Sequence, residues 1–296
     1  MFDHAYAELN GIRLHYAVAG SGKLMLFLHG FPEFWYAWRK QLDDFGRDHL
    51  AVAPDMRGYN LSSKPKSIDQ YGIKYLIEDV RALAEHLGAD RFTLVAHDWG
   101  GGVAWAFALA HPEYLERLVV INMTHPGIFA RELRDNPAQQ KASEYMVWFQ
   151  TSEAEQRLTE NNYAQLLQTV IEPGLAQGYF SDVDRRAYLD AWSQPGAITG
   201  GLNYYRAARL GPGSSEGKLL TGNYAADPTA LKVQVPTLVI WGEKDPYLLP
   251  GNLNGLEEFV PHLTVKRIPA GTHWVIHEHP RLVNQYIRDF IAGNPI

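Results

Sequence analysis

One aspartate, Asp98, stands at the centre of a turn whose type and position could support nucleophilic chemistry. The run from Val95 to Gly101 reads VAHDWGG and lies between an apolar segment typical of a strand and a segment typical of a helix. Small residues on both sides of Asp98, namely Ala96 and Gly100, permit a tight turn that directs the central side chain into a site. Ester hydrolases have serine at this position, whereas a carboxylate attacks an sp³ carbon and forms an alkyl ester with the enzyme. The alternative interpretation is a helix N-cap, which is a common role for aspartate.

A histidine and a carboxylate further along the chain could hydrolyse such an ester. His273 lies just past the last expected strand, where it could take a proton from the attacking water. Asp245 follows the preceding strand and could orient this histidine and stabilise its imidazolium, and Glu243 is a competitor for the same role. The order nucleophile, acid and histidine along the chain is the one that accompanies this kind of turn. We therefore expect Asp98, Asp245 and His273 to act as a catalytic triad.

A second turn could supply hydrogen-bond donors to the same site. The HGFP run at 29–32 directly follows an apolar strand-like segment. The main-chain N–H groups of Phe31 and Trp99 could form an oxyanion hole, whose charge develops when water attacks the carboxyl carbon of the aspartyl ester. We expect His29 and Pro32, in the same turn, to border the substrate. An ordinary turn at the end of a strand is the alternative interpretation.

The elements that must position these residues alternate between strands and helices. An Asn-Gly pair inside 5–19 predicts a hairpin. Short apolar runs indicate strands that are buried on both faces, and longer segments with apolar residues at helical spacing indicate helices. The expected buried strands are 24–28, 50–54, 91–96, 118–122, 237–241 and 264–268, and the expected helices are 75–88, 100–111 and 280–291. This alternation predicts a mostly parallel sheet with helices on both sides, and a ligand beyond the carboxyl ends of its strands.

The middle of the chain lacks this alternation. From about 124 to 224 no convincing buried strand is present, and the segment is polar, aromatic and helix-like, with expected breaks at 172–174 and 194–196. A Gly- and Ser-rich stretch at 211–222 predicts a flexible connection. We therefore expect a core of residues 1–124 and 223–296 with an inserted helical cap at 125–222.

Composition restricts the classes of partner and cofactor. The chain has 296 residues, a net charge of −6 and no cysteine, which excludes disulfides and a thiol nucleophile. The sequence contains no Lys/Arg block, no leader-like N-terminus and no apolar run long enough for a bilayer, so we expect no nucleic-acid or membrane partner and a cytoplasmic location. The 12 histidines show no convincing ligand spacing, and His277 and His279 fit a structural or solvent-facing role better. We expect no metal and no organic cofactor, and either a monomer or a homodimer.

Taken together, these motifs resemble the epoxide hydrolases of the α/β-hydrolase superfamily. The resemblance implies an α/β-hydrolase fold, with a mostly parallel eight-stranded sheet flanked by helices and an inserted cap. It also implies hydrolysis of an epoxide to a vicinal diol without a cofactor. The sequence departs from the family pattern at Asn60, Ala96 and Thr272, where relatives usually have glycine. The motifs that carry the resemblance are HGFPE at 29–33, WYAWR at 35–39, DMRGY at 55–59, HDWGG at 97–101, EKD at 243–245 and HW at 273–274.

The resemblance extends to the middle segment. In this family two cap tyrosines hold the epoxide oxygen and protonate it as the ring opens. The NYYR run at 203–206 resembles the pattern around one of them and assigns that role to Tyr205, although Tyr204 stands beside it. The EYMVWFQ run at 144–150 assigns the other role to Tyr145. Trp148 and Phe149 in the same run would line the site of a small apolar epoxide.

Two other functions use the same fold. A haloalkane or haloacid dehalogenase shares the aspartate nucleophile, the histidine and the acid, but it releases halide. Haloalkane dehalogenases typically have Asn or Trp where this chain has Phe31, and fluoroacetate-type enzymes have Arg where it has Trp99. An inactive ligand-binding member of the fold would ordinarily lack one of the reacting groups, all of which can be placed here. The residues at positions 31 and 99, together with the tyrosine pair, favour epoxides over halides.

Overall fold

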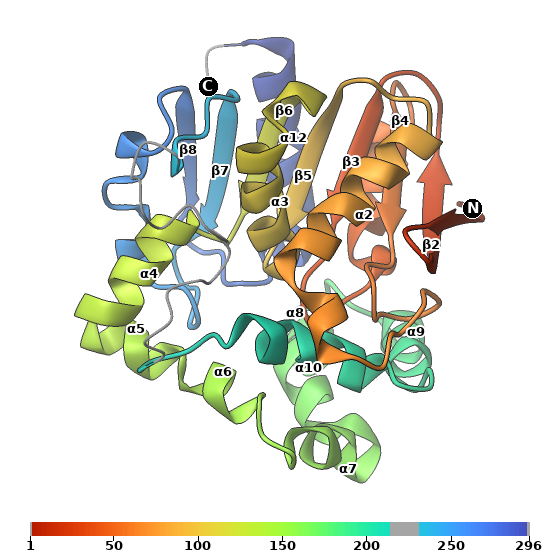
Figure 1. Cartoon of the computed structure of the whole chain (residues 1–296), viewed down its shortest axis with the longest axis vertical. Coiled ribbons are helices and arrows are strands. Elements are labelled where there is room, and N and C mark those ends of the chain that lie inside the picture. The colour runs from red at the N-terminus through yellow and green to blue at the C-terminus, as the bar shows by residue number, and fades with distance from the viewer. Residues whose placement is uncertain (1, 214–230, 295–296) are drawn as a thin grey trace.

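The computed structural model describes residues 2–213 and 231–294, and its centre is a sheet of eight strands in the order β1-β2-β4-β3-β5-β6-β7-β8 (Figure 1). Strands β1 and β2 pair antiparallel, as do β2 and β4, and all other neighbours are parallel. The mostly parallel, eight-stranded sheet predicted from the sequence is therefore confirmed. The strands are β1 (Asp3–Leu9), β2 (Ile12–Ala19), β3 (Leu24–Leu28), β4 (Leu50–Pro54), β5 (Phe92–His97), β6 (Leu115–Ile121), β7 (Thr237–Gly242) and β8 (Leu263–Ile268).

The N-terminal hairpin turns at the predicted dipeptide. Asn10 has φ of 51° and Gly11 has φ of 76°, which are the two positive values that a tight hairpin turn of this type requires. The register pairs Leu9 with Ile12, so the turn consists of these two residues alone. The sequence prediction of a hairpin at this position is confirmed.

Two apolar layers cover the two faces of the sheet. Helices α2 (Ile73–His86) and α3 (Trp99–Ala110) pack together on one face, and α1 (Arg39–Phe45) and α12 (Pro280–Ala292) pack together on the other. All residues of β3, β5 and β7 are buried because side chains on both faces of these strands lie under helices. The continuous apolar runs in the sequence reflect this double burial. The remaining core helices are α11 (Val275–Glu278) and the 3₁₀ turns Trp35–Trp38, Ile68–Tyr71, Pro112–Tyr114, Pro250–Leu253 and Leu256–Glu258.

Seven helices, which we call the cap helices, lie between β6 and β7 in the described chain. They gather at one end of the sheet, in the lower part of Figure 1. A core at 1–124 and 223–296 and a cap at 125–222 stay predictions, because the expected boundary at 222 lies outside the described residues. The cap helices are α4 (Pro126–Asp135), α5 (Pro137–Ala142), α6 (Glu144–Trp148), α7 (Ala154–Leu166), α8 (Glu172–Gln177), α9 (Asp182–Trp192) and α10 (Ala197–Ala208).

The expected breaks in this segment are partly wrong. At 172–174 the chain does not break, because a π-helical turn, Leu167–Ile171, leads directly into α8, with Pro173 near its N-terminus. Proline removes one hydrogen bond from a continuous helix, and here it follows a π-helical turn, where the regular hydrogen-bond ladder is already interrupted. The break at 194–196 is present, between α9 and α10. Most of the expected flexible connection at 211–222 lies outside the described residues.

An unpredicted interruption occurs inside α7. Asn161, Asn162 and Tyr163 have φ of 50°, 56° and 62°, so three successive residues adopt the left-handed conformation. Asparagine accepts this conformation at a lower cost than most residues, whereas tyrosine does not. The Tyr163 hydroxyl donates to the main-chain oxygen of Trp192 at 3.3 Å, and this contact helps to hold the turn against α9.

Among the described residues, no helix has the length and apolar character needed to cross a membrane.

Candidate active site

Asp98 lies at a strained turn between β5 and α3. Its φ is 50° and its ψ is −124°, a combination that a non-glycine residue adopts only where the surrounding structure enforces it. A Cβ on Gly100 would lie 2.3 Å from the main-chain oxygen of Leu28, so the turn presses directly against β3. A Cβ on Gly30 would lie 2.1 Å from an oxygen of the Asp98 carboxylate. Glycine at these two positions therefore lets the turn and the carboxylate occupy their places.

Two main-chain N–H groups meet the Asp98 carboxylate. The N–H of Phe31 donates to Oδ1 at 2.7 Å, and the N–H of Trp99 also hydrogen-bonds the carboxylate. These are the two groups expected to form an oxyanion hole. The peptide bond between Phe31 and Pro32 is cis. An oxyanion on Oδ1 would find the N–H of Phe31 already in position, with the N–H of Trp99 also at the carboxylate.

His273 lies between the two carboxylates named for the triad. Its Nδ1–H donates to Oδ2 of Asp245 at 2.7 Å, and its Nε2 is 3.5 Å from Oδ2 of Asp98. Glu243, the competitor, instead forms an ion pair with Arg267 at 3.2 Å near the surface. The structure thus brings together Asp98, Asp245 and His273, and it places Glu243 away from the imidazole.

Asp245 is itself held by several donors. The Asn122 side-chain amide donates to its Oδ2 at 2.7 Å, and the main-chain N–H groups of Tyr247 and Leu248 donate to its Oδ1 at 2.8 and 3.0 Å. These contacts fix the direction in which the carboxylate faces His273. The sequence analysis missed Asn122, although its position directly after the buried strand β6 was a usable signal.

The electrostatics favour an ion pair between Asp98 and His273. Burial alone would lower the pKa of His273, but the Asp245 and Asp98 carboxylates outweigh it and raise this pKa to about 10. Burial would raise the pKa of Asp98, but the hydrogen bond and charge of His273, with help from His97 and the Trp99 N–H, hold it below its ordinary value. At neutral pH the carboxylate is therefore ionised, and the imidazole carries the proton.

Tyr145 and Tyr205 face the same site from α6 and α10. Their ring centroids are 6.2 Å apart, and the ring of Tyr205 packs edge-on against that of Trp99 at 5.0 Å. Burial and the nearby Asp98 charge hold the pKa values of both phenols well above the ordinary value, with the other phenol adding to the shift at Tyr205. Both hydroxyls therefore keep their protons. Tyr204 points elsewhere, because its hydroxyl donates to the main-chain oxygen of Arg57 at 2.8 Å.

A cavity of about 150 Å³ joins the core residues to the cap residues. Of the four residues expected to contact substrate, Pro32, Trp148 and Phe149 line it. Tyr247 and several cap residues also line it but were not predicted. The full lining is Phe31, Pro32, Asp98, Tyr145, Trp148, Phe149, Leu158, Gln165, Leu166, Thr169, Tyr205, Tyr247, His273 and Trp274.

His29, the fourth expected contact, does not line this cavity. Its side chain is fully buried, its Nδ1–H donates to the Gly30 carbonyl at 2.9 Å, and its Nε2 accepts from the Met56 N–H at 3.0 Å. Both ring nitrogens are thus engaged by the main chain. The expectation that His29 binds substrate does not fit this placement, since the side chain fixes the turn that carries Phe31.

A buried cluster behind His273 was also missed by the sequence analysis. The Glu33 carboxylate accepts hydrogen bonds from Nε2–H of His277 at 2.6 Å and from the Tyr188 hydroxyl at 2.7 Å. His97 lies 3.5 Å from its other oxygen and donates to the main-chain oxygen of His273 at 2.8 Å. The cluster therefore links α9 of the cap to the loop that carries the base. His277 is buried and hydrogen-bonded to Glu33, and burial lowers its pKa, so this placement fits the expected structural role.

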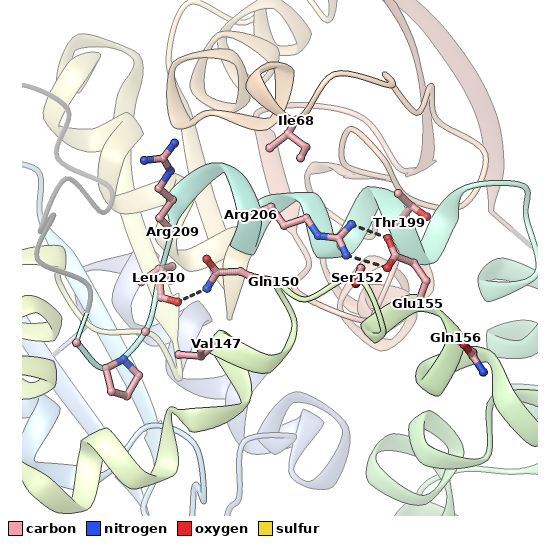
Figure 2. Close-up of a pocket in the computed structure, with 13 residues that line it drawn as sticks. Ile68, Val147, Gln150, Ser152, Glu155, Gln156, Thr199, Arg206, Arg209 and Leu210 are labelled. Carbon is pink, nitrogen blue, oxygen red and sulfur yellow. Dashed lines mark hydrogen bonds and ion pairs between the residues drawn. The ribbon is translucent and has the colours of Figure 1, made fainter.

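A larger hollow of about 1080 Å³ lies outside this site (Figure 2). Residues of α10 and of the chain from α6 to α7 line it, and none of the expected catalytic residues does. Figure 2 shows its main polar groups already paired, with Arg206 bound to Glu155 and the Gln150 amide donating to the Leu210 carbonyl. The smaller cavity holds the reactive groups and is therefore the candidate site of the reaction. Within the described residues, no cluster of three or more histidines and carboxylates suits a metal ion.

Comparisons with known proteins agree with this geometry. Residues 23–280 match the family model described as alpha/beta hydrolase fold. Epoxide hydrolase 2 of Caenorhabditis elegans is 35% identical over 98% of this chain and 80% of its own length. An AB hydrolase superfamily protein of Bacillus subtilis is 37% identical over 97% of both chains. A crystal structure of Bacillus megaterium epoxide hydrolase with an inhibitor has a TM-score of 0.91 and 42% identity, and the match covers 97% of this chain and all of that one. The chain therefore belongs to the α/β-hydrolase fold family and, within it, to the group that contains the epoxide hydrolases.

Proposed function

We propose that this protein is an epoxide hydrolase that forms a covalent ester on Asp98. The observation that carries the proposal is the convergence of a nucleophile, a base and two protonated phenols on one apolar cavity. Asp98 and His273 enter it from the core, and Tyr145 and Tyr205 enter it from the cap helices. Two of the three relatives named above are epoxide hydrolases, and they support the same reaction.

In the first step the ring opens. The epoxide oxygen lies between Tyr145 and Tyr205, and an oxygen of Asp98 attacks a ring carbon from the opposite side. A new C–O bond forms to the carboxylate while the ring C–O bond breaks, and a phenol gives its proton to the leaving oxygen. The raised pKa values of both phenols match this role, because each hydroxyl holds a proton until an alkoxide develops beside it.

The ester then alters the titration of His273. Esterification removes the negative charge of Asp98, which is one of the two charges that raise the pKa of His273. The imidazolium can therefore return its proton to the phenolate left by the first step. Neutral His273, oriented by Asp245, is then the base for the second step.

In the second step water cleaves the ester. His273 takes a proton from water, and the hydroxide attacks the carboxyl carbon of Asp98. The oxyanion accepts hydrogen bonds from the N–H groups of Phe31 and Trp99. The ester C–O bond breaks, the departing alkoxide takes the carboxyl proton, and the diol leaves with Asp98 and His273 again an ion pair. The steps thus need only groups of this chain, water and the substrate.

Dehalogenation uses the same triad and is not favoured. A halide leaving group needs N–H donors beside the nucleophile, and the indole of Trp99 is the natural one. In this structure that indole hydrogen-bonds the Tyr205 side chain. Two of the three relatives named above are epoxide hydrolases as well.

The proposal is tested by measuring diol and halide separately. The purified protein is mixed in turn with styrene oxide, 1-chlorobutane and fluoroacetate. Diol from styrene oxide without halide from the other two supports the proposal. Halide release without diol would replace it with dehalogenation.

The cytoplasmic location and the monomeric or dimeric state stay predictions from composition. We propose that residues 125–222 act as the cap over this site.

A further inference from the structure

The volume of the active-site cavity restricts the substrate. At about 150 Å³ it is smaller than the 300–1,000 Å³ of sites that hold drug-sized ligands. Apolar protein cavities of about 150 Å³ take up molecules such as benzene. A substrate must fit its epoxide ring and its substituent into this space. The part of the substrate that lies beside Asp98 is therefore limited to about one flat six-membered ring, and any longer part must extend through the open side of the cavity.

The charges of the cavity restrict the substituent further. Among the residues that line it, the ionisable groups other than phenols are Asp98 and His273, which already pair with each other. None of these lining residues is a lysine or arginine. A carboxylate on the substrate would lack a counterion and would approach the negative Asp98. The substituent should be neutral.

The walls of the cavity are interlocked aromatic rings. Phe31 packs edge-on against Phe149 at 5.2 Å, and Phe149 packs against Tyr205 at 5.1 Å. Tyr145 packs edge-on against Tyr247 at 5.4 Å, and Tyr247 lies 5.2 Å from the ring of His273. Rings that support one another across core and cap leave little freedom to widen the space. A second large substituent, on the other epoxide carbon, would have to enter these walls.

Polar residues mark the place where the cavity meets solvent. Gln165 is exposed and Thr169 is half-buried, and both line the cavity from the segment between the left-handed turn and α8. Leu158 and Leu166, by contrast, are buried and line the cavity from α7, Leu158 from its first half and Leu166 from its last residue. Leu158 carries no polar atom and so limits the space without taking part in the chemistry.

We propose that the preferred substrates are neutral terminal epoxides with one compact aromatic substituent of about the size of phenyl, and that Leu158 sets this limit. This inference rests on the proposed epoxide hydrolysis. Epoxides with large groups on both carbons, and long-chain epoxides with a carboxylate, are poor substrates. The cavity binds the flat ring between aromatic side chains while the terminal epoxide carbon faces Asp98.

The test compares kcat/KM for styrene oxide, trans-stilbene oxide and 9,10-epoxystearate. For the unmodified protein, kcat/KM for styrene oxide should exceed kcat/KM for each of the other two by at least about tenfold. Even a single group that does not fit a pocket lowers kcat/KM by about that factor. Equal or higher values for trans-stilbene oxide or epoxystearate would overturn the proposal. If no epoxide yields diol, the proposed reaction itself is wrong, so the two failures are distinguishable.

Two variants of Leu158 test its role in opposite directions. Leu158→Ala should lower the ratio of kcat/KM for styrene oxide to kcat/KM for trans-stilbene oxide severalfold. Leu158→Phe should lower kcat/KM for styrene oxide more than for propylene oxide, which is smaller. Leu167→Ala is the matched control, because Leu167 is also buried in the cap but is absent from the cavity lining. Ratios for both Leu158 variants that equal that of the control would overturn the assignment to Leu158.

Discussion

The two oxygens of the Asp98 carboxylate have different surroundings. Oδ1 accepts the N–H of Phe31, and Oδ2 faces Nε2 of His273 at 3.5 Å. An ester formed on the Oδ2 side would leave Oδ1 on the N–H of Phe31, where the charge of the second step develops. One side chain can therefore serve both as nucleophile and as the carbonyl that water later attacks.

Asp98→Asn should reduce diol formation by about a thousandfold or more, because the loss of a nucleophile removes a whole covalent pathway. The amide fills the same space, so the fold should survive. Initial rates should be followed together with the intact mass of the protein, since His273 could slowly hydrolyse the amide back to aspartate. Normal activity from the first minutes, before any mass change, would contradict the assignment of Asp98.

His273→Gln should separate the two steps. Ring opening needs the ionised Asp98, but ester hydrolysis needs the base, so the ester should accumulate on the variant. Intact-mass spectrometry after addition of styrene oxide should show a protein heavier by one substrate molecule, and Asp98→Asn should not show it. If no adduct forms while diol production is lost, His273 has a part in ring opening instead.

Among the elements, α10 packs tightly against the core. A Cβ on Gly200 would lie 2.2 Å from the main-chain oxygen of Gly58, and one on Gly201 would lie 2.6 Å from the Phe31 ring. The same helix carries Tyr205 into the cavity. The position of the phenol over Asp98 therefore depends on a contact between two backbones that only glycine permits.

Gly200→Ala should push α10 away from the core. Overpacking of this kind costs about 1–3 kcal/mol of stability. Displacement of Tyr205 should also lower kcat by about tenfold or more, since small errors in position have large kinetic effects. Thr199→Ala is the control because Thr199 is exposed on the same helix. Thermal melting and kcat are compared, and an unchanged kcat in Gly200→Ala would show that α10 does not position the phenol.

The sequence predicted these elements to different extents. The buried strands and the Asn-Gly hairpin were predictable because apolar runs and a turn dipeptide are local signals. The left-handed turn at Asn161 to Tyr163 was not, because contacts such as that with Trp192 on α9 help to hold Tyr163 in a conformation that it otherwise disfavours. The Glu33 cluster was missed for the same reason, since His277 lies far from Glu33 in the sequence and only the fold brings them together.

For the molecule as a whole, the buried ion pairs make stability depend on pH. The pKa of His273 rises from an ordinary 6.5 to about 10 in the folded state. A histidine with a raised pKa stabilises the fold fully below pH 6.5, and this contribution is lost as the pH rises toward 10. The lowered pKa of Asp98 acts at the other end, where stability is lost as the pH falls below its ordinary value of 3.8.

Urea unfolding at pH 6 and pH 9.5 tests this dependence. The unmodified protein should lose more unfolding free energy between these values than His273→Gln does, by more than about 1 kcal/mol. At pH 9.5 only the unmodified protein must hold a proton on the folded imidazole that the unfolded chain has released. Groups that titrate in both proteins contribute equally to the two losses of unfolding free energy, so their contributions cancel when one loss is subtracted from the other. Equal losses would mean that His273 is not held as a cation in the folded state.

The order of the sheet has a further consequence for how this molecule can change. Strands β6 and β7 are parallel neighbours, so the chain must cross from the end of one to the start of the other in any case. The cap helices occupy that obligatory connection, and their insertion disturbs no strand pairing. The nucleophile, the base and its carboxylate partner thus lie outside this connection, whereas both phenols and many of the residues that line the cavity lie inside it. Over evolution, or by transplanting the connection from a relative that keeps the two tyrosines, the range of accepted molecules can diverge while the triad is inherited intact.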